Sequence, residues 1–212
     1  MKLFTYFRSS AAYRVRIALN FKGLTALAVP VHLRRGEQSA PSFLRANPFG
    51  LVPALEHGGH VLSQSLAIIE YLEEIHPSPP LLPQAPADRA FVRSIALSIA
   101  CDIHPLNNLR VLNYLHDELA VDPAHRDRWY AHWIETGLSA LETLLARDAR
   151  VGAFCYGDTP TLADICLVPQ IYNAERMNCR LDAYPLVCRA ASNARRHAAF
   201  RAAEPERQPD AE

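Results

Sequence analysis

The chain has 212 residues, half of them hydrophobic, which is enough for one large core or two small domains. Lys plus Arg and Asp plus Glu both number 22, so the basic excess of nucleic-acid-binding proteins is absent and no nucleic acid partner is expected. No apolar run approaches the roughly 20 residues that span a bilayer, and Arg8 interrupts the apolar N-terminal segment. Neither a membrane partner nor a signal peptide is therefore expected.

The cysteines indicate free thiols. Their number is odd and no two of them stand in CxxC spacing; they are Cys101, Cys155, Cys166, Cys179 and Cys188. This usage is typical of a reducing compartment rather than of a disulfide scaffold or a zinc knuckle. A cytoplasmic location is expected, and no metal site is predicted.

The first part of the chain is predicted to form a small α/β domain. The expected elements are a strand over 2–7, a helix over 11–22, a strand over 27–31, a short helix over 39–45, strands over 54–57 and 60–62, and a helix that begins at 65. Gly23 is a natural helix end, and Pro30 places its strand at a sheet edge. Gly58-Gly59 is typical of a two-residue hairpin turn. The order β-α-β-α-β-β-α predicts a thioredoxin-like fold.

The second part is predicted to be helical. It follows a segment dense in proline, which indicates a linker and a domain boundary: Pro77, Pro79, Pro80, Pro83 and Pro86. Helices are expected over 87–118, 123–147, 161–175 and 185–198, with a possible break at Pro105 in the first. Thr161 and Asp164 resemble a capping box. The expected domains are 1–80 and 86–212, with loose order after Phe200.

A candidate ligand site lies around Val52-Pro53 and Ser65. A proline that opens a strand cannot donate to a ladder, and a cis bond before it directs the backbone of Val52 outward. Ser65 opens a helix, so its N–H and hydroxyl suit a carboxylate. The two features together indicate an anionic, peptide-like ligand. Either feature alone is more commonly an edge strand or an ordinary N-cap.

Ser9 and Ser10 form a second candidate feature, between the first strand and the first helix. A hydroxyl and a helix N-terminus both stabilise an anion, and both lower the pKa of a thiol placed there. The next residues are Ala11 and Ala12, so any thiol at this loop must come from a ligand. A plain N-cap serine is the alternative interpretation.

Arginines provide candidate carboxylate contacts, because the guanidinium fork matches a carboxylate. Arg8 precedes the serine loop, and Arg110 and Arg176 belong to the helical part. Arg14 and Arg16 stand two apart on one helix and cannot share a face, so at least one is expected at the surface. Each arginine taken singly is more often a surface charge than a site residue.

At these motifs the chain resembles zeta-class glutathione transferases, whose signature has the general form SSCxxRVRIAL. The resemblance is carried in order by residues 6–19, Asn47-Pro48, Val52-Pro53, Gln64-Ser65 with AIIEYLEE, residues 101–105, and Gly157-Asp158 with TLAD and LVPQ. It covers essentially the whole chain. Ala11 is the one departure that matters, because the family signature has cysteine there.

The resemblance implies the glutathione transferase fold, a thioredoxin-like N-terminal domain plus an all-α C-terminal domain, in a cytosolic homodimer. It implies glutathione as cofactor, with contacts at Ser9, Ser10, Ala11, Gln38, Val52, Gln64, Ser65, His104 and Asn108. Ser9 and Ser10 are the expected catalytic residues, since the serine at the position of Ser9 assists the thiolate. Substrate carboxylates are expected at Arg8, Arg110 and Arg176.

The activity implied by the resemblance is glutathione-dependent cis–trans isomerisation of a maleyl keto acid, either maleylacetoacetate or maleylpyruvate, in aromatic catabolism. A general transferase acting on small electrophiles or haloacids is the second hypothesis, and the three arginines disfavour it. A non-catalytic glutathione-binding module is the third. Loss of Ser9 or Ser65 would have supported it, and both residues are present.

Overall fold

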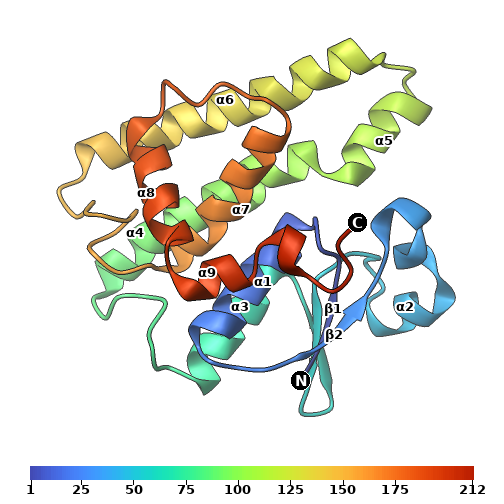
Figure 1. The fold of residues 1–212 in the computed structure, drawn as a ribbon, viewed down its shortest axis with the longest axis horizontal. Helices are drawn as coiled ribbons and strands as arrows, with labels where there is room; N and C mark the ends of the chain where they lie inside the picture. Colours follow the sequence, from blue (N-terminus) through green and yellow to red (C-terminus); the bar gives the residue numbers. More distant parts are fainter. The chain divides into compact units, whose positions relative to one another are not determined.

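The computed structural model describes residues 1–212, and the chain forms two compact units (Figure 1). Unit 1 contains Met1–Leu81 together with Arg196–Glu212, and unit 2 contains Leu82–Arg195. None of the helices combines the length and the apolar character that a membrane span requires.

Unit 1 is built on a four-stranded mixed sheet in the order β2-β1-β3-β4. Its elements are β1 (Lys2–Thr5), α1 (Ser10–Phe21), β2 (Leu27–Pro30), 3₁₀ turns at Leu33–Arg35 and Glu37–Ser39, α2 (Pro41–Ala46), β3 (Ala54–His57), β4 (His60–Ser63) and α3 (Ser65–Ile75). β1 and β2 run parallel, and the other pairs are antiparallel. The predicted thioredoxin-like order is confirmed. Pro30 lies on the edge strand, and Gly58 and Gly59 both have positive φ, as the hairpin turn requires.

Helices α1 and α3 lie together on one face of this sheet (Figure 1). Lys22, at the end of α1, is buried and donates through Nζ to Glu73 Oε2 at 2.6 Å, to the His76 carbonyl at 2.6 Å and to the Pro79 carbonyl at 3.0 Å. Glu73 in turn accepts from the Leu81 N–H at 3.0 Å. The Lys22–Glu73 pair therefore anchors the end of α3 and the proline-rich segment that follows it in the chain.

The C-terminal segment is ordered and belongs to unit 1, whereas the sequence predicted loose order and a place in the helical domain 86–212. Helix α9 (Ala198–Ala202) packs against α1, and Phe200 has no exposed surface. A 3₁₀ turn follows at Pro205–Arg207. The physical reason is a set of long-range bonds, including one from Arg16 Nε to the Ala203 carbonyl at 3.2 Å. The composition of the segment does not reveal such partners.

Unit 2 is entirely helical. Its elements are α4 (Pro86–Leu97), a π-helical turn at Ser98–Ile103, a 3₁₀ turn at His104–Asn107, α5 (Leu109–Asp117), α6 (Pro123–Arg147), α7 (Leu162–Arg176) and α8 (Pro185–Arg195). The helix predicted over 87–118 is therefore interrupted by about ten residues of wider and tighter winding. Pro105 cannot continue the α-helical ladder. Gly137 on α6 makes room beside this region, since a Cβ there would lie 2.3 Å from Ile103 Cδ1.

Helix α7 is the centre of unit 2, packed against α4 and α8 and buried along almost its whole length. Its predicted capping box is confirmed. Asp164 is fully buried and accepts from the Thr161 N–H at 2.8 Å and from the Cys155 N–H at 2.9 Å. Because these bonds satisfy N–H groups at and before the helix start, the box fixes where α7 begins.

Candidate glutathione site

The loop between β1 and α1 ends at Ser9, which is the N-cap of α1. Its Oγ accepts from the Ala12 N–H at 3.2 Å, and its own N–H donates to the Tyr6 carbonyl at 2.9 Å. Ser10 is buried in the first turn, and Ala11 is partly exposed beside it. The Ser9 hydroxyl proton is not used by the capping bond. It therefore remains available to an anion at the positive end of the helix dipole.

Both arginines of α1 are buried, so the prediction that at least one is a surface charge was wrong. Arg14 is 2% exposed and Arg16 is 7% exposed. Arg14 Nη1 donates to Ser65 Oγ at 3.3 Å, which joins α1 to the start of α3. Arg16 is held by the backbone of the β1–α1 loop. Different faces of one helix can both be interior when the sheet, α3 and the C-terminal segment surround it.

The stretch from Val52 to Ser65 has the geometry that its sequence suggests. The Val52-Pro53 bond is cis, and neither the N–H nor the C=O of Val52 makes a hydrogen bond within the chain. The N-cap of α3 is Gln64, whose side chain makes no capping bond. Its backbone lies at φ 69° and ψ 119°, an unfavourable region for a residue with a side chain. The first N–H groups of α3 thus have no side-chain cap.

A third uncommitted group comes from Gln38, in the second 3₁₀ turn. Its Oε1 is buried and has no hydrogen-bond partner. Buried acceptors without partners are uncommon in folded proteins, and a ligand donor is one explanation for such an atom. The sequence alone gives no local signal for Gln38, and only the family resemblance predicts a role for it.

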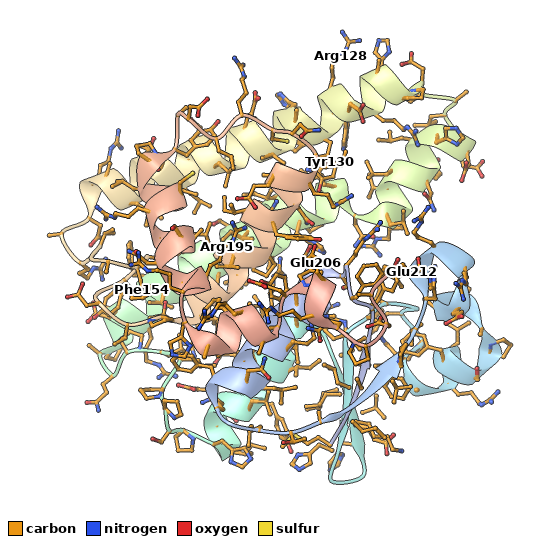
Figure 2. The ribbon with its side chains drawn as sticks, viewed as in Figure 1. Arg128, Tyr130, Phe154, Arg195, Glu206 and Glu212 are labelled. Atoms are coloured by element: carbon orange, nitrogen blue, oxygen red, sulfur yellow. The ribbon has the colours of Figure 1, made fainter.

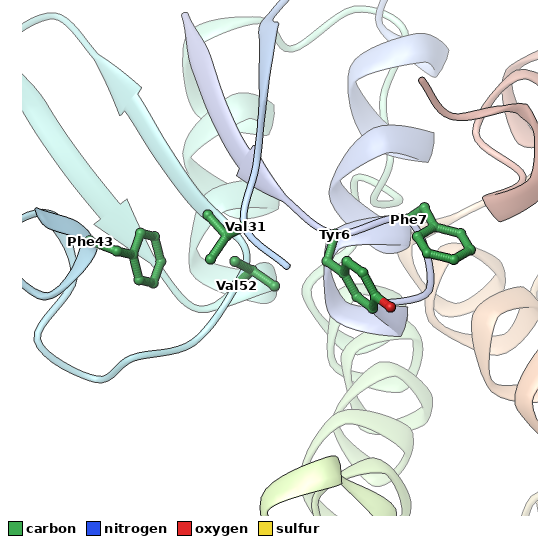
Figure 3. Packing of buried hydrophobic residues seen from close by; sticks show 5 residues of the cluster. All are labelled: Tyr6, Phe7, Val31, Phe43 and Val52. Atoms are coloured by element: carbon green, nitrogen blue, oxygen red, sulfur yellow. The ribbon is translucent and has the colours of Figure 1, made fainter. Parts of the chain in front are cut away.

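An apolar cluster lies beneath the loop that ends at Ser9 and the loop that contains Val52. Tyr6, Phe7, Val31, Phe43 and Val52 pack together (Figure 3). Phe7 stands just before Arg8 and Ser9, and Val52 carries the unpaired backbone groups. The Arg8 guanidinium lies 5.0 Å from the centre of the Phe7 ring. The cluster therefore connects the serine loop to the Val52 loop, and together with the Arg14–Ser65 bond it brings Ser9, Val52 and Ser65 into one neighbourhood of unit 1.

The donor and acceptor set of this neighbourhood suits a peptide that carries a carboxylate and a thiol. The backbone of Val52 offers one donor and one acceptor, which is what an extended peptide needs for pairing. The uncapped N-terminus of α3 suits the carboxylate. Ser9 and the N-terminus of α1 suit a thiolate. No group of three or more His, Cys, Asp or Glu side chains gathers in a way that would hold a metal ion.

The remaining predicted residues belong to unit 2. His104 opens the 3₁₀ turn that follows the π-helical turn. Asn108 is the N-cap of α5, with Oδ1 accepting from the Arg110 N–H at 3.1 Å. The Arg110 side chain is exposed. Irregular helical winding of this kind often occurs at functional sites, because it changes the direction of side chains.

Arg176 lies at the end of α7, beside Tyr130 of α6, which Figure 2 labels. Burial raises the pKa of Tyr130 to about 12, although the Arg176 guanidinium, hydrogen-bonded to the phenol, acts in the opposite direction. Tyr130 thus stays neutral and holds Arg176 by one bond. It also lines a cavity of about 200 Å³ with Leu109, Leu112, Asn113, Arg126, Asp127 and Met177. Tyr130 has no local signal in the sequence, since a tyrosine within a long helix is typical of core packing.

Family models identify both halves of the chain. The model of the glutathione S-transferase N-terminal domain matches residues 1–74, and that of the C-terminal domain matches residues 123–197. The chain belongs to the glutathione S-transferase family. Its thioredoxin-like and all-helical parts are those of the glutathione transferase fold, as predicted, and its relatives place it in the zeta class.

The relatives are similar over their full length. A probable maleylacetoacetate isomerase of Vibrio cholerae is 50% identical over 99% of this chain and 97% of its own length. A maleylpyruvate isomerase of a Ralstonia species is 46% identical, with 99% of both chains covered. A solved holo maleylpyruvate isomerase, described as a bacterial zeta-class glutathione transferase, superimposes with a TM-score of 0.98 at 45% identity, covering 100% of both chains.

Proposed function

We propose that this glutathione S-transferase family member is a glutathione-dependent cis–trans isomerase of a maleyl keto acid, either maleylacetoacetate or maleylpyruvate. The observation that carries the proposal is the neighbourhood in unit 1, where Val52, Gln38 and the N-terminus of α3 leave backbone and side-chain groups without partners. These groups are the complement of a cysteinyl peptide with a terminal carboxylate. The names of the full-length relatives support the reaction class.

Glutathione binding is assigned to both parts of the chain. The backbone of Val52 pairs with the cysteinyl residue, and Gln64 and Ser65 hold the γ-glutamyl carboxylate at the helix start. Gln38 accepts from the ligand through its buried Oε1. Ala11 lines the site beside the serines, and His104 and Asn108 are further proposed contacts. In this division residues 1–80 are assigned chiefly to glutathione and residues 86–212 chiefly to the substrate, with Arg8, His104 and Asn108 as the exceptions.

The chemistry that bound glutathione supplies is a thiolate, which adds reversibly to the conjugated double bond so that this bond can rotate. The chain's role is to keep that sulfur ionised and to hold the substrate. Ser9 donates a hydrogen bond from its hydroxyl to the ionised sulfur, and the N-terminus of α1 adds a positive potential. Ser10, in the first turn of the same helix, is assigned a supporting catalytic role. No protein cysteine takes part, since position 11 is alanine.

The substrate is a dicarboxylate, and Arg8, Arg110 and Arg176 are assigned to its two carboxylates. Tyr130 holds the guanidinium of Arg176 and thereby orients it. A neutral phenol serves this purpose better than a phenolate, because it leaves the positive charge of the arginine available to the substrate. The positive charge of these arginines would also stabilise negative charge on a substrate oxygen.

A homodimer in the cytoplasm completes the proposal. Phe49, which follows Pro48 in the loop before Val52, is 65% exposed and offers an apolar contact for a second subunit. Five free cysteines agree with a reducing compartment. Light scattering coupled to gel filtration measures the mass directly.

The test is a spectrophotometric isomerisation assay with maleylacetoacetate and maleylpyruvate in parallel, with and without glutathione. Glutathione-dependent turnover of one substrate far above the other supports the proposal and identifies the substrate. Turnover of neither, with glutathione still bound, favours a general transferase or a binding module. Ala11→Cys is the accompanying variant. Activity absent in this protein but present in that variant would refute the role of glutathione as sole nucleophile.

The residues are tested separately. Arg176→Met should lower kcat/KM at least about tenfold, equivalent to ~1.4 kcal/mol, if this side chain contacts a carboxylate. Arg180→Met is the matched control, because Arg180 is an exposed arginine in the same region with no assigned role. Equal kinetics of the two variants would remove Arg176 from the site.

A further inference from the structure

The C-terminal segment, residues 205–212, is bonded to the loop that carries Ser9. Asp210 Oδ2 accepts from the Phe7 N–H at 2.9 Å, across 203 residues of sequence. At the end of the segment, Glu212 Oε1 lies 2.6 Å from His32 Nε2 and 3.2 Å from Arg35 Nη2. Figure 2 labels Glu206 and Glu212 on this segment. The carboxylate of Asp210 is thus bonded to the backbone at Phe7, two residues before Ser9.

The same loop is held from its other side by Arg16. This buried guanidinium donates to the Phe7 carbonyl at 2.9 Å, to the Tyr6 carbonyl at 3.3 Å and to Thr5 Oγ1 at 3.2 Å. Its Nε donates to the Ala203 carbonyl, which also belongs to the C-terminal part of the chain. The loop backbone is therefore bonded through the carbonyls of Tyr6 and Phe7 and through the N–H of Phe7.

The N–H of Phe7 has no other acceptor in the chain. The loop is a tight turn, closed by the bond from the Ser9 N–H to the Tyr6 carbonyl, and no strand partner reaches Phe7. Without Asp210 this partly buried donor is unsatisfied, and the peptide plane between Tyr6 and Phe7 is fixed only through its carbonyl side. A shift of that plane moves Ser9, because the Tyr6 carbonyl is the acceptor for the Ser9 N–H.

We propose that Asp210 is a positioning residue for the catalytic loop: by accepting the Phe7 N–H it fixes the turn that aims the Ser9 hydroxyl at the bound thiolate. This inference rests on the proposed function, because it needs Ser9 to donate to a glutathione sulfur. A purely structural role is the alternative, in which Asp210 only attaches the C-terminal segment to unit 1. The two differ in whether the ionisation of the ligand thiol responds to Asp210.

Three variants separate these roles. Asp210→Ala removes the acceptor, whereas Asp210→Asn keeps an oxygen that can accept from the Phe7 N–H. Arg207→Ala is the matched control, since Arg207 lies in the same segment and only pairs with Glu204 at the surface. Thermal unfolding identifies variants that are globally destabilised. Two readouts besides turnover are used: hydrogen exchange of residues 7–11 without ligand, and the ultraviolet titration of the bound glutathione thiol.

Asp210→Ala should speed exchange at Phe7 and Ser9, raise the pKa of the bound thiol by about one unit and lower kcat/KM about tenfold, with Asp210→Asn close to wild type. An unchanged thiol pKa in Asp210→Ala, with exchange raised, would overturn the positioning role and leave the structural one. Unchanged exchange would overturn the contact itself. If the wild type fails to isomerise either substrate, the proposed function falls, while the exchange and thiol titration still decide the role of Asp210.

Discussion

Replacing Lys22 by methionine tests the interior of unit 1. Lys22 Nζ is bonded to Glu73, to the His76 carbonyl and to the Pro79 carbonyl, and its side chain has no exposed surface. At 2.6 Å the two charges attract by about 6 kcal/mol if the effective dielectric constant is about 20. Removal of each ion from water opposes this by several kcal/mol, so the intact pair contributes little net stability.

Removing only one partner is a different matter, because Glu73 then remains as a buried carboxylate without its cation. Lys22→Met should therefore lower the free energy of unfolding by about 3–5 kcal/mol. Glu73→Gln retains an oxygen for the Leu81 N–H and removes the charge. The double variant should be less destabilised than the sum of the two single variants, by roughly 1–3 kcal/mol.

The assay is urea unfolding followed by far-UV circular dichroism and, in parallel, by tryptophan fluorescence. Both tryptophans, Trp129 and Trp133, belong to α6, so fluorescence reports on unit 2 while dichroism reports on both units. Lys2→Met is the control, since Lys2 and Glu56 form an exposed pair at 3.0 Å that should contribute about 0–1 kcal/mol. Equal losses in Lys22→Met and Lys2→Met would refute the reasoning.

Three further outcomes are expected. Gln64→Gly should relieve the positive φ and raise stability by about 1 kcal/mol while weakening glutathione binding, which urea unfolding and calorimetric titration measure. Gly137→Ala should lower stability by about 1–3 kcal/mol by contact with Ile103, and the double variant with Ile103→Ala should be less destabilised than the sum of the two single variants, as followed by fluorescence. A hydrogen bond from Arg150 lowers the pKa of Asp148 to about 2. The ionised carboxylate of Asp148 therefore stabilises the fold above about pH 4, and this contribution is lost as the pH falls towards 2. Asp148→Asn should reduce the pH dependence of the free energy of unfolding in that range, which unfolding curves at several pH values measure.

Local chemistry explains which features could be predicted from the sequence. The Gly58-Gly59 turn, the edge strand at Pro30 and the Thr161 capping box depend on neighbours a few residues away, and all three are confirmed. Ser9 is the N-cap of α1, which is the interpretation that the sequence left as the alternative. The motifs that position backbone groups toward a ligand are of this local kind, which is why the candidate site of unit 1 was recognisable.

Features that depend on distant partners were missed or misjudged. Arg14 and Arg16 are interior because Ser65 and the Ala203 carbonyl receive them, 51 and 187 residues away. The helical periodicity of the sequence cannot reveal acceptors that are so distant in the chain. The segment after Phe200 has the composition of a loosely ordered terminus, yet Asp210 accepts a hydrogen bond from the Phe7 N–H, 203 residues earlier in the chain. Whether the assigned residues contact glutathione and substrate stays a prediction, since contact with a ligand is not encoded in spacing.

The discontinuity of unit 1 has a consequence for synthesis on the ribosome. The chain leaves this unit at Leu81 and returns to it only at Arg196, with the whole of unit 2 between. A growing chain therefore presents a complete helical unit for folding while the α/β unit still lacks α9 and the acceptor for Phe7. The loop that contains Ser9 is made before unit 2, yet it reaches its final bonding only after unit 2 has been made.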